Sequence, residues 1–197
     1  LDTTPPTVTS CAPPISLSVN AFCAAALPNL TSSAVITDNC SAVTVTQFPP
    51  AGVPLAVGNY TVVLTATDAV GNSVQCSTVV TVNDNIAPTI SVCAPAQSAN
   101  ADANCTAVVP NFTGGVVASD NCAVASITQS PAAGSPAPLG VNVITISVKD
   151  AGNNEAICTT TFTVNDVTLP VITTCAPDQT VAAGAGCTAL VPNFTAN

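Results

Sequence analysis

Basic and aromatic side chains are almost absent from this sequence. Its 197 residues include one Lys or Arg, no His, no Trp, one Tyr and five Phe, against ten Asp and Glu, which gives a net charge of −9. A polyanion with a single basic side chain cannot neutralise phosphates, so nucleic acid is a very poor partner. An anionic membrane surface is disfavoured for the same reason. Cations remain suitable partners.

The same absences argue against an enzyme. General acid–base catalysis needs groups that titrate near neutrality, and beyond its Asp residues the chain offers only Lys149 and Glu155. A catalytic cysteine would have no His to activate it. A pair of carboxylates acting on a glycosidic bond is a further alternative, but there is one Glu and no aromatic platform for a sugar. We therefore expect no catalysis.

Membrane-spanning and targeting segments are also absent from the sequence. No uninterrupted apolar run reaches the length of a membrane span, and neither a signal peptide nor an initiating Met is visible. We therefore expect a mature or internal piece of a longer chain. Hydrophobic residues still make up 48%, so cores of Val, Ile, Leu, Ala and cystine are expected.

A period of 82 residues runs through the whole chain. Cysteines recur at this interval, at 11, 93 and 175; 23, 105 and 187; 40 and 122; and 76 and 158. The Asp-Asn-Cys motif keeps the same step, at 38–40 and 120–122. The predicted units are 1–83, 84–165 and a truncated third unit, 166–197. The third has too little core to fold alone, so we expect it to be completed by further chain or by a neighbouring molecule.

Every element predicted inside a unit is a β-strand. Alternate residues are apolar from Tyr60 to Thr67 and again from Val143 to Lys149, the period-2 pattern of half-buried strands. Turn sequences follow at Asp68–Asn72 and Asp150–Asn153. Several short strands in about 82 residues predict an all-β fold of tandem immunoglobulin-like Greek-key β-sandwiches.

The order and spacing of these motifs resemble the hyalin repeat (HYR), an immunoglobulin-like module of extracellular proteins. The carrying features are an opening Asp-x-x-x-Pro, Cys-Ala-Pro after the first strand, Asp-Asn-Cys, the Thr-Ala-Thr-Asp-Ala-Val-Gly-Asn turn and a closing Cys-Ser-Thr-Val-Val-Thr-Val strand. The resemblance covers essentially the whole chain, although the second unit has Val-Lys-Asp150 before its turn. It implies adhesion or cell-surface display without catalysis, and it does not imply one ligand.

Four widely spaced cysteines in each complete unit predict disulfides. Close Cys pairs and His, which are typical of structural zinc sites, are missing. Disulfides place the protein in an oxidising, extracellular compartment. Three connectivities are possible in each unit. The immunoglobulin-like fold favours these pairings: Cys11–Cys40, Cys23–Cys76, Cys93–Cys122 and Cys105–Cys158.

Acidic residues recur in register at three places in each unit. They lie in the N-terminal lead-in, in the loop after the second strand and in the penultimate hairpin turn: Asp2, Asp38 and Asp68, then Asp84, Asp120 and Asp150, with Asp166 opening the third unit. In an immunoglobulin-like sandwich these places gather at one pole, next to the preceding unit. Together with the neighbouring Asn39, Asn72, Asn85, Asn121 and Asn153, they offer the oxygens that Ca²⁺ prefers. The alternative is that the side chains only cap turns.

Asn-x-Ser/Thr frames are candidate sites for N-linked glycans. Those at Asn29, Asn59 and Asn111 are the preferred sites; similar frames occur at Asn39, Asn104 and Asn193. The Thr-rich outer faces suit O-glycans or packing against sister chains, and the alternative is a simple solvated surface.

Two functions of different class remain after these exclusions. The first is a structural and adhesive array, a stalk or filament segment that self-associates with neighbouring repeats or sister chains. The second is a binding module for carbohydrate or a protein receptor, which would use loops at one pole. The aromatic or Arg residues expected at a binding hot spot are scarce, and this favours the structural role.

Overall fold

The computed structural model describes residues 2–195, and the regular structure in that range consists of β-strands and two short 3-10 turns. The first repeat contains β1 (Thr7–Ser10), β2 (Ile15–Ser18), β3 (Ala25–Ala26), η1 (Thr31–Ser33), β4 (Val35–Thr37), β5 (Thr44–Phe48), β6 (Pro54–Leu55), β7 (Gly58–Thr67) and β8 (Ser73–Asn83). The second repeats this order with β9 (Thr89–Val92), β10 (Gln97–Asn100), β11 (Thr106–Val108), η2 (Thr113–Gly115), β12 (Val117–Ser119), β13 (Val124–Ser130), β14 (Pro136–Pro138), β15 (Gly140–Asp150) and β16 (Glu155–Asn165).

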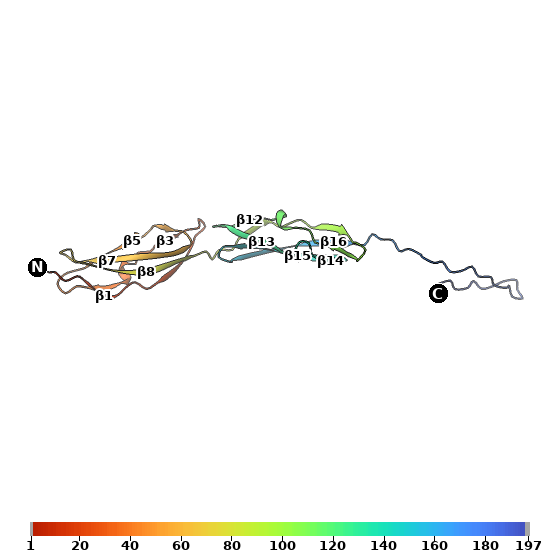
Figure 1. The fold of residues 1–197 in the computed structure, drawn as a ribbon, viewed down its shortest axis with the longest axis horizontal. Coiled ribbons are helices and arrows are strands. Elements are labelled where there is room, and N and C mark those ends of the chain that lie inside the picture. Colours follow the sequence, from red (N-terminus) through yellow and green to blue (C-terminus); the bar gives the residue numbers. More distant parts are fainter. Residues whose placement is uncertain (1, 196–197) are drawn as a thin grey trace. The chain divides into compact units, whose positions relative to one another are not determined.

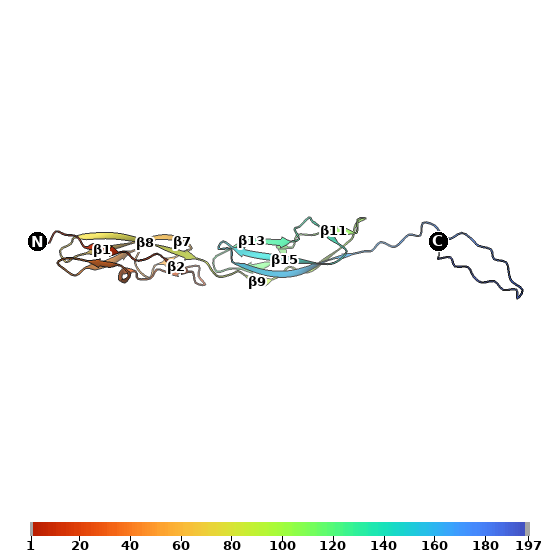
Figure 2. The same ribbon diagram turned by 90° about the horizontal axis from the view of Figure 1, so that it is seen from below.

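Each repeat is a sandwich of one four-stranded sheet and two shorter strand pairs. In the first repeat the large sheet has the order β2-β8-β7-β5, with β2 parallel to β8, and the pairs are β1-β4 and β3-β6. The second repeat has the same topology, with the order β10-β16-β15-β13. Strands β7 and β8 of the first repeat lie side by side in Figure 1, as do β15 and β16 of the second, and Figure 2 shows β13 beside β15. The predicted all-β sandwich is confirmed.

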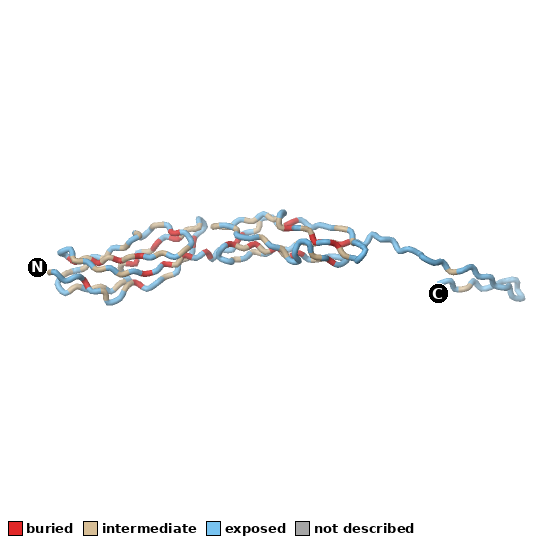
Figure 3. The backbone as a smooth tube through the Cα atoms, in the orientation of Figure 1, coloured by how far each residue is buried: buried red, intermediate tan, exposed pale blue. Residues whose placement is uncertain are grey.

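Alternating apolar residues of the long hairpins form the two cores. Val62, Leu64 and Ala66 of β7 are fully buried, as are Ile144 and its inward neighbours on β15. These are the inward-facing sets predicted from the period-2 pattern. Leu55, on β6, belongs to the same hydrophobic cluster as Val62 and Leu64. Buried positions follow the strands of both repeats in Figure 3.

The core of the second repeat contains two aromatic rings, whereas the composition predicted cores of Val, Ile, Leu, Ala and cystine. Phe112 and Phe162 are both 1% exposed, and their rings pack edge to face with centroids 6.4 Å apart. The equivalent positions of the first repeat hold the smaller Leu30 and Val80, which are also buried. Cys93 and Cys158, which form a disulfide, both pack against this core.

In each repeat, a glutamine side chain on an edge strand of the four-stranded sheet, β5 or β13, forms hydrogen bonds with the loop before the 3-10 turn. Gln129 Oε1 accepts a hydrogen bond from the Phe112 amide at 2.7 Å, and its Nε2 donates to the carbonyls of Pro110 and Pro131. Gln47 makes the same contacts, beginning with the Leu30 amide at 2.7 Å. A single side chain therefore satisfies several backbone groups that no strand ladder reaches.

The predicted disulfide pairing is wrong. Within the described residues the bonds are Cys11–Cys76, Cys93–Cys158 and Cys23–Cys122, while Cys40, Cys105, Cys175 and Cys187 are unpaired and exposed. The predicted Cys11–Cys40, Cys23–Cys76, Cys93–Cys122 and Cys105–Cys158 do not form. The reason lies in the first strand, which pairs with β4 as β1 and then crosses to β8 as β2. This crossing brings Cys11 to 5.9 Å from Cys76, Cα to Cα.

The third disulfide joins one repeat to the next. Cys23 and Cys122 have Cα atoms 4.8 Å apart and are separated by 99 residues. Cys122 also packs against the core of the first repeat. The bond was not predicted from the sequence, because all of the predicted pairings lie within one unit.

Contacts divide the chain into two units, residues 1–165, which hold both repeats, and residues 166–197. Between 166 and 195 the structure has no strand or helix, and nearly every side chain is exposed. None of the helices in the described range is long and apolar enough to cross a membrane.

Candidate cation sites

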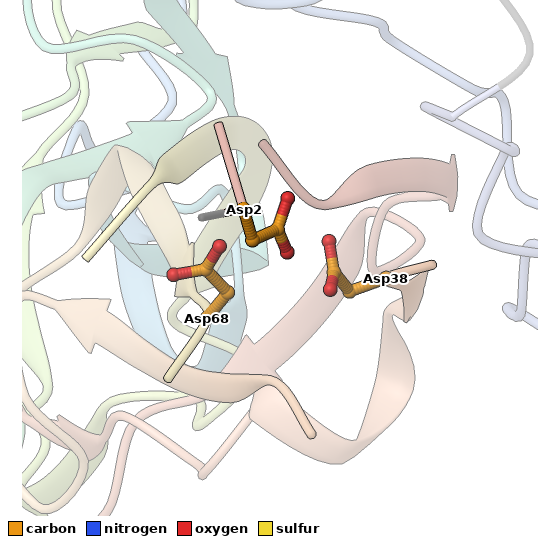
Figure 4. A group of neighbouring side chains, drawn as sticks. All are labelled: Asp2, Asp38 and Asp68. Carbon is orange, nitrogen blue, oxygen red and sulfur yellow. The ribbon is translucent and has the colours of Figure 1, made fainter. Parts of the chain in front are cut away.

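Three aspartates from distant parts of the first repeat meet at one pole of the sandwich. Asp2 lies in the lead-in, the segment before the first strand (residues 2–6, and 84–88 in the second repeat). Asp38 follows β4, and Asp68 directly follows β7. One carboxylate oxygen of each lies within 4.8 Å of the others, and Figure 4 shows the three side chains together.

The second repeat builds the same cluster from Asp84, Asp120 and Asp150. Their carboxylate oxygens also lie within 4.8 Å of one another. Asp84 and Asp150 are buried, at 7% and 3% exposure, and Asp120 is half-buried. The structure thus brings together all six aspartates singled out in the sequence, three at a time. Asp166 lies outside both clusters and is exposed.

Turn capping fixes the direction of each carboxylate. Asp38 Oδ1 accepts hydrogen bonds from the amides of Cys40 and Ser41, at 3.0 and 2.9 Å. Asp120 Oδ2 accepts the equivalent bonds from Cys122 and Ala123. Local capping, the alternative considered in the sequence analysis, is therefore one role of these side chains.

The second oxygen of several carboxylates has no such partner. Asp2 Oδ2, Asp38 Oδ2 and Asp120 Oδ1 are buried and accept no hydrogen bond from any described residue. The same is true of Asn121 Oδ1, beside the second cluster. A buried polar atom without a partner is costly, and clustered carboxylates also repel one another. Both costs are removed by a cation, which takes its ligands from such oxygens.

Asp68 illustrates how the surroundings favour the charged form. Partial desolvation raises the pKa of this carboxyl, but hydrogen bonds from the Asn72 side chain and from the amides of Val70, Asn72 and Gly71 outweigh it. The net pKa is below its ordinary value. Desolvation and then the negative charge of Asp2 raise the pKa of the neighbouring Cys40 thiol.

A turn asparagine ties each lead-in to its cluster. Asn154 Nδ2 donates to the Asp84 carbonyl at 2.9 Å and to Asp150 Oδ2 at 2.7 Å. Asn72 makes the same pair of bonds in the first repeat, to the Asp2 carbonyl at 3.3 Å and to Asp68 Oδ2. Asn72 is the asparagine predicted for the first repeat, whereas Asn154 stands in the second repeat in place of the predicted Asn153.

The constant period of 82 identifies the correct asparagine in the second turn. It aligns Asn72 with Asn154, and Gly71 with Asn153. Gly71 and Asn153 both have left-handed backbones, with φ of 100° and 65°. Gly152 is needed for space and not for a left-handed backbone, because a Cβ there would lie 2.8 Å from the Asp84 carbonyl oxygen of the lead-in.

The second cluster lies directly at the junction with the first repeat. Asn121 Nδ2 donates to Asp84 Oδ1 at 3.3 Å and to the carbonyl of Asn20, in the first repeat, at 3.2 Å. Its neighbour Cys122 forms the disulfide with Cys23. One loop therefore holds a candidate cation ligand, an inter-repeat hydrogen bond and an inter-repeat disulfide. From the sequence, Asn121 was expected only to offer an oxygen ligand to a cation.

Comparison with known proteins gives structural matches alone. No family model matches the chain, and no curated protein matches it. Among solved structures, the human mucin-like protocadherin EC1-2 has a TM-score of 0.41 and 12% identity, over 82% of this chain and 98% of that one. Immunoglobulin domains 1–4 of Sidekick-1 give 0.46 and 11%, over 82% and 49%. Drosophila N-cadherin EC1-4 gives 0.41 and 13%, over 83% and 50%.

These matches are cadherin and immunoglobulin-domain proteins. The chain spans about half the length of the Sidekick-1 and N-cadherin structures. With TM-scores below 0.5, the likenesses carry no argument about the function of this chain, and its fold rests on its own strand order. The resemblance to the hyalin repeat stays a prediction.

Proposed function

We propose that this chain is a segment of a non-catalytic extracellular repeat array with a structural and adhesive role. It serves as a stalk or filament segment at a cell surface, and Ca²⁺ bound at the leading pole of each repeat stiffens the junctions. The observation that carries the proposal is the pair of equivalent three-aspartate clusters, the second of which includes Asp84 of the inter-repeat lead-in.

The donor chemistry of the clusters suits a hard divalent cation. Ca²⁺ takes six to eight oxygen ligands from carboxylates, amides and carbonyls. Each cluster supplies three carboxylates, and Asn121 Oδ1 adds an unpartnered amide oxygen in the second. Calcium is therefore the preferred ion.

The position of the second cluster supports a mechanical role. Asp84 follows β8 directly, so a cation held by Asp84, Asp120 and Asp150 fixes the connection between repeats to the body of the second repeat. The Cys23–Cys122 bond ties the same junction at a second point. Two ties at one junction restrict its bending, as an extended array requires.

Glycans and self-association complete the proposal. Asn29, Asn59 and Asn111 are all exposed, so each is accessible for modification. Charged residues are only 6% of the chain, and glycans would keep such a weakly charged surface soluble. Neighbouring repeats and sister chains are the proposed partners.

Electron microscopy of native material, with and without a calcium chelator, tests this function. We expect extended particles or filaments that become more flexible or collapse in chelator. Compact particles that are indifferent to chelator would contradict the proposal. The variant Asp120→Asn should reproduce the effect of chelator at its own junction, whereas Asp102→Asn, a carboxylate outside both clusters, should not.

A further inference from the structure

The inter-repeat disulfide is formed by two loops that recur elsewhere in the chain. The outgoing loop, residues 20–24, carries Cys23 and has its equivalent at 102–106 with Cys105. The receiving loop, residues 120–123, carries Cys122 and has its equivalent at 38–41 with Cys40. One outgoing and one receiving loop are joined. The loops at 102–106 and 38–41 carry exposed, unpaired cysteines, and so does a third outgoing loop, at 184–188, with Cys187.

The unpaired outgoing loop of the second repeat has the backbone of the paired one. Cys23 and Cys105 have left-handed φ angles of 56° and 58°. The amide of each donates to a carbonyl three residues earlier, that of Asn20 at 3.1 Å and that of Asp102 at 3.0 Å. Cys105 is therefore already presented to solvent in the backbone conformation in which Cys23 is bonded.

The unpaired receiving loop also matches its bonded counterpart. The amide of Cys40 donates to Asp38, as that of Cys122 donates to Asp120, at 3.0 and 2.9 Å. Asn39 precedes Cys40 just as Asn121 precedes Cys122, and Asn121 binds the Asn20 carbonyl of the partner loop. Asn39 is exposed, and the equivalent acceptor on an outgoing loop is the carbonyl of Asp102.

We propose that Cys40 and Cys105 are the two halves of further inter-repeat disulfides, formed with other repeats of this same type. Cys105 joins the receiving loop of a repeat that follows, and Cys40 joins the outgoing loop of a repeat that precedes. The carrying observation is the Cys23–Cys122 bond, in which the equivalent residues are already joined. The inference rests on the proposed array function and adds a covalent bond at every junction.

The bond forms by thiol–disulfide exchange with a disulfide oxidant. Each new S–S bond takes two thiols, releases two protons and passes two electrons to the oxidant, which is reduced to two thiols. An oxidising extracellular compartment supplies such oxidants. The intra-repeat bonds Cys11–Cys76 and Cys93–Cys158 require the same chemistry, so the proposal needs no additional reactant.

Disulfide mapping of native protein, blocked with a thiol alkylating agent before digestion, tests the pairing. We expect Cys40 and Cys105 to be inaccessible to the agent and to appear in cross-linked peptides. A Cys105–Cys40 peptide identifies a second copy of this chain as the partner. A link from Cys105 to an Asp-Asn-Cys peptide outside residues 1–197 identifies a following repeat. Alkylated thiols at both positions, or a bond from Cys40 to Cys11, would overturn the proposal.

Reconstitution with the 197-residue chain gives a second test. Cys40→Ser and Cys105→Ser are each made in a background of Cys175→Ser and Cys187→Ser, so that each variant keeps one half of the junction. In a buffer of oxidised and reduced glutathione, we expect a disulfide-linked heterodimer when the two variants are mixed and none from either alone. Dimers in equal amount from each single variant, or no heterodimer while Cys23–Cys122 stays formed, would overturn the proposal.

The outcome is separable from that of the proposed function. Native particles that are extended and sensitive to chelator, but alkylated at Cys40 and Cys105, would leave the calcium-stiffened array standing and remove only the disulfide.

Discussion

At the scale of single residues, the aspartates of the two clusters divide their oxygens between two tasks. One oxygen of Asp38 or Asp120 is held by the amides of its own loop, and the other is buried without a partner. Local capping therefore leaves one oxygen of the side chain available for the proposed cation. The same division explains why isolated Asp and Asn residues, without a dense calcium-loop motif, still assemble a candidate site.

The lead-in of the second repeat passes close to Gly152, which leaves room for it because glycine has no side chain. In Gly152→Ala the new Cβ would lie 2.8 Å from the Asp84 carbonyl oxygen and 3.1 Å from Asn154 Nδ2. We expect the lead-in to shift and the second repeat to lose about 1–3 kcal/mol of unfolding free energy, as overpacking usually costs. Calcium affinity at that cluster should fall as well.

Chemical denaturation and calcium titration measure the two effects of Gly152→Ala. The matched control is Gly114→Ala, where a Cβ meets nothing within 4 Å. Equal behaviour of the two variants would show that the close approach of Asp84 is unimportant.

Asp102, in the outgoing loop of the second repeat, should make the unfolding free energy depend on pH in the acid range. Hydrogen bonds from the backbone of Thr106 and Asn104 hold the pKa of this exposed carboxyl below its ordinary value. The stability it contributes is therefore present above the ordinary pKa of Asp and is lost as the pH falls through the lower folded value. Asp102→Asn should make the dependence of unfolding free energy on pH shallower in that acid range.

The first repeat allows the opposite substitution as a control, because Asn20 occupies the position equivalent to Asp102. The Oδ1 atom of Asn20 accepts a hydrogen bond from the Phe22 amide at 2.8 Å. Asn20→Asp should make the acid dependence steeper, as measured by denaturation from pH 2 to pH 6. Identical pH profiles for both variants and the parent chain would refute the assignment.

At the scale of elements, the hairpins followed from the sequence and the disulfides did not. The alternation around Val62 and Ile144 identifies the inward faces because a strand repeats every two residues. Disulfide pairing depends on where the first strand crosses between sheets and on the left-handed turn at Cys23. Neither leaves a periodic pattern, so spacing alone could not select Cys11–Cys76 from the alternatives.

Gln129 is an element-scale contact that the pattern of apolar residues does not reveal. In Gln129→Ala the buried amide of Phe112 loses its acceptor, and the carbonyls of Pro110 and Pro131 lose a donor. We expect a loss of about 1–3 kcal/mol, the usual cost of leaving a buried polar group unpaired.

Urea denaturation of Gln129→Ala against Gln75→Ala checks this expectation. Gln75 is exposed and bonds only to the Thr65 hydroxyl, so its variant should stay close to the parent chain. A Gln129→Ala chain as stable as the Gln75 variant would mean that the glutamine does not hold the loop.

At the scale of the whole molecule, the period of 82 residues predicts both the repetition and the candidate site. The recurrence of Asp in register identifies all six aspartates of the clusters, because equivalent positions in two repeats of the same fold have the same arrangement. The sequence did not reveal that the junction is tied twice, by Asn121 and by Cys23–Cys122. A disulfide between repeats cannot be predicted when each unit is assumed to pair only its own cysteines.

Calorimetric titration of Ca²⁺ into chelator-treated protein tests the central claim most directly. The account predicts two sites per chain, one for each three-aspartate cluster, with one site lost in Asp38→Asn, the other in Asp120→Asn, and both kept in Asp102→Asn. A stabilisation of about 2.7 kcal/mol should accompany a calcium concentration about one hundred times the dissociation constant. No binding by the parent chain, or binding unchanged in both cluster variants, would contradict the account.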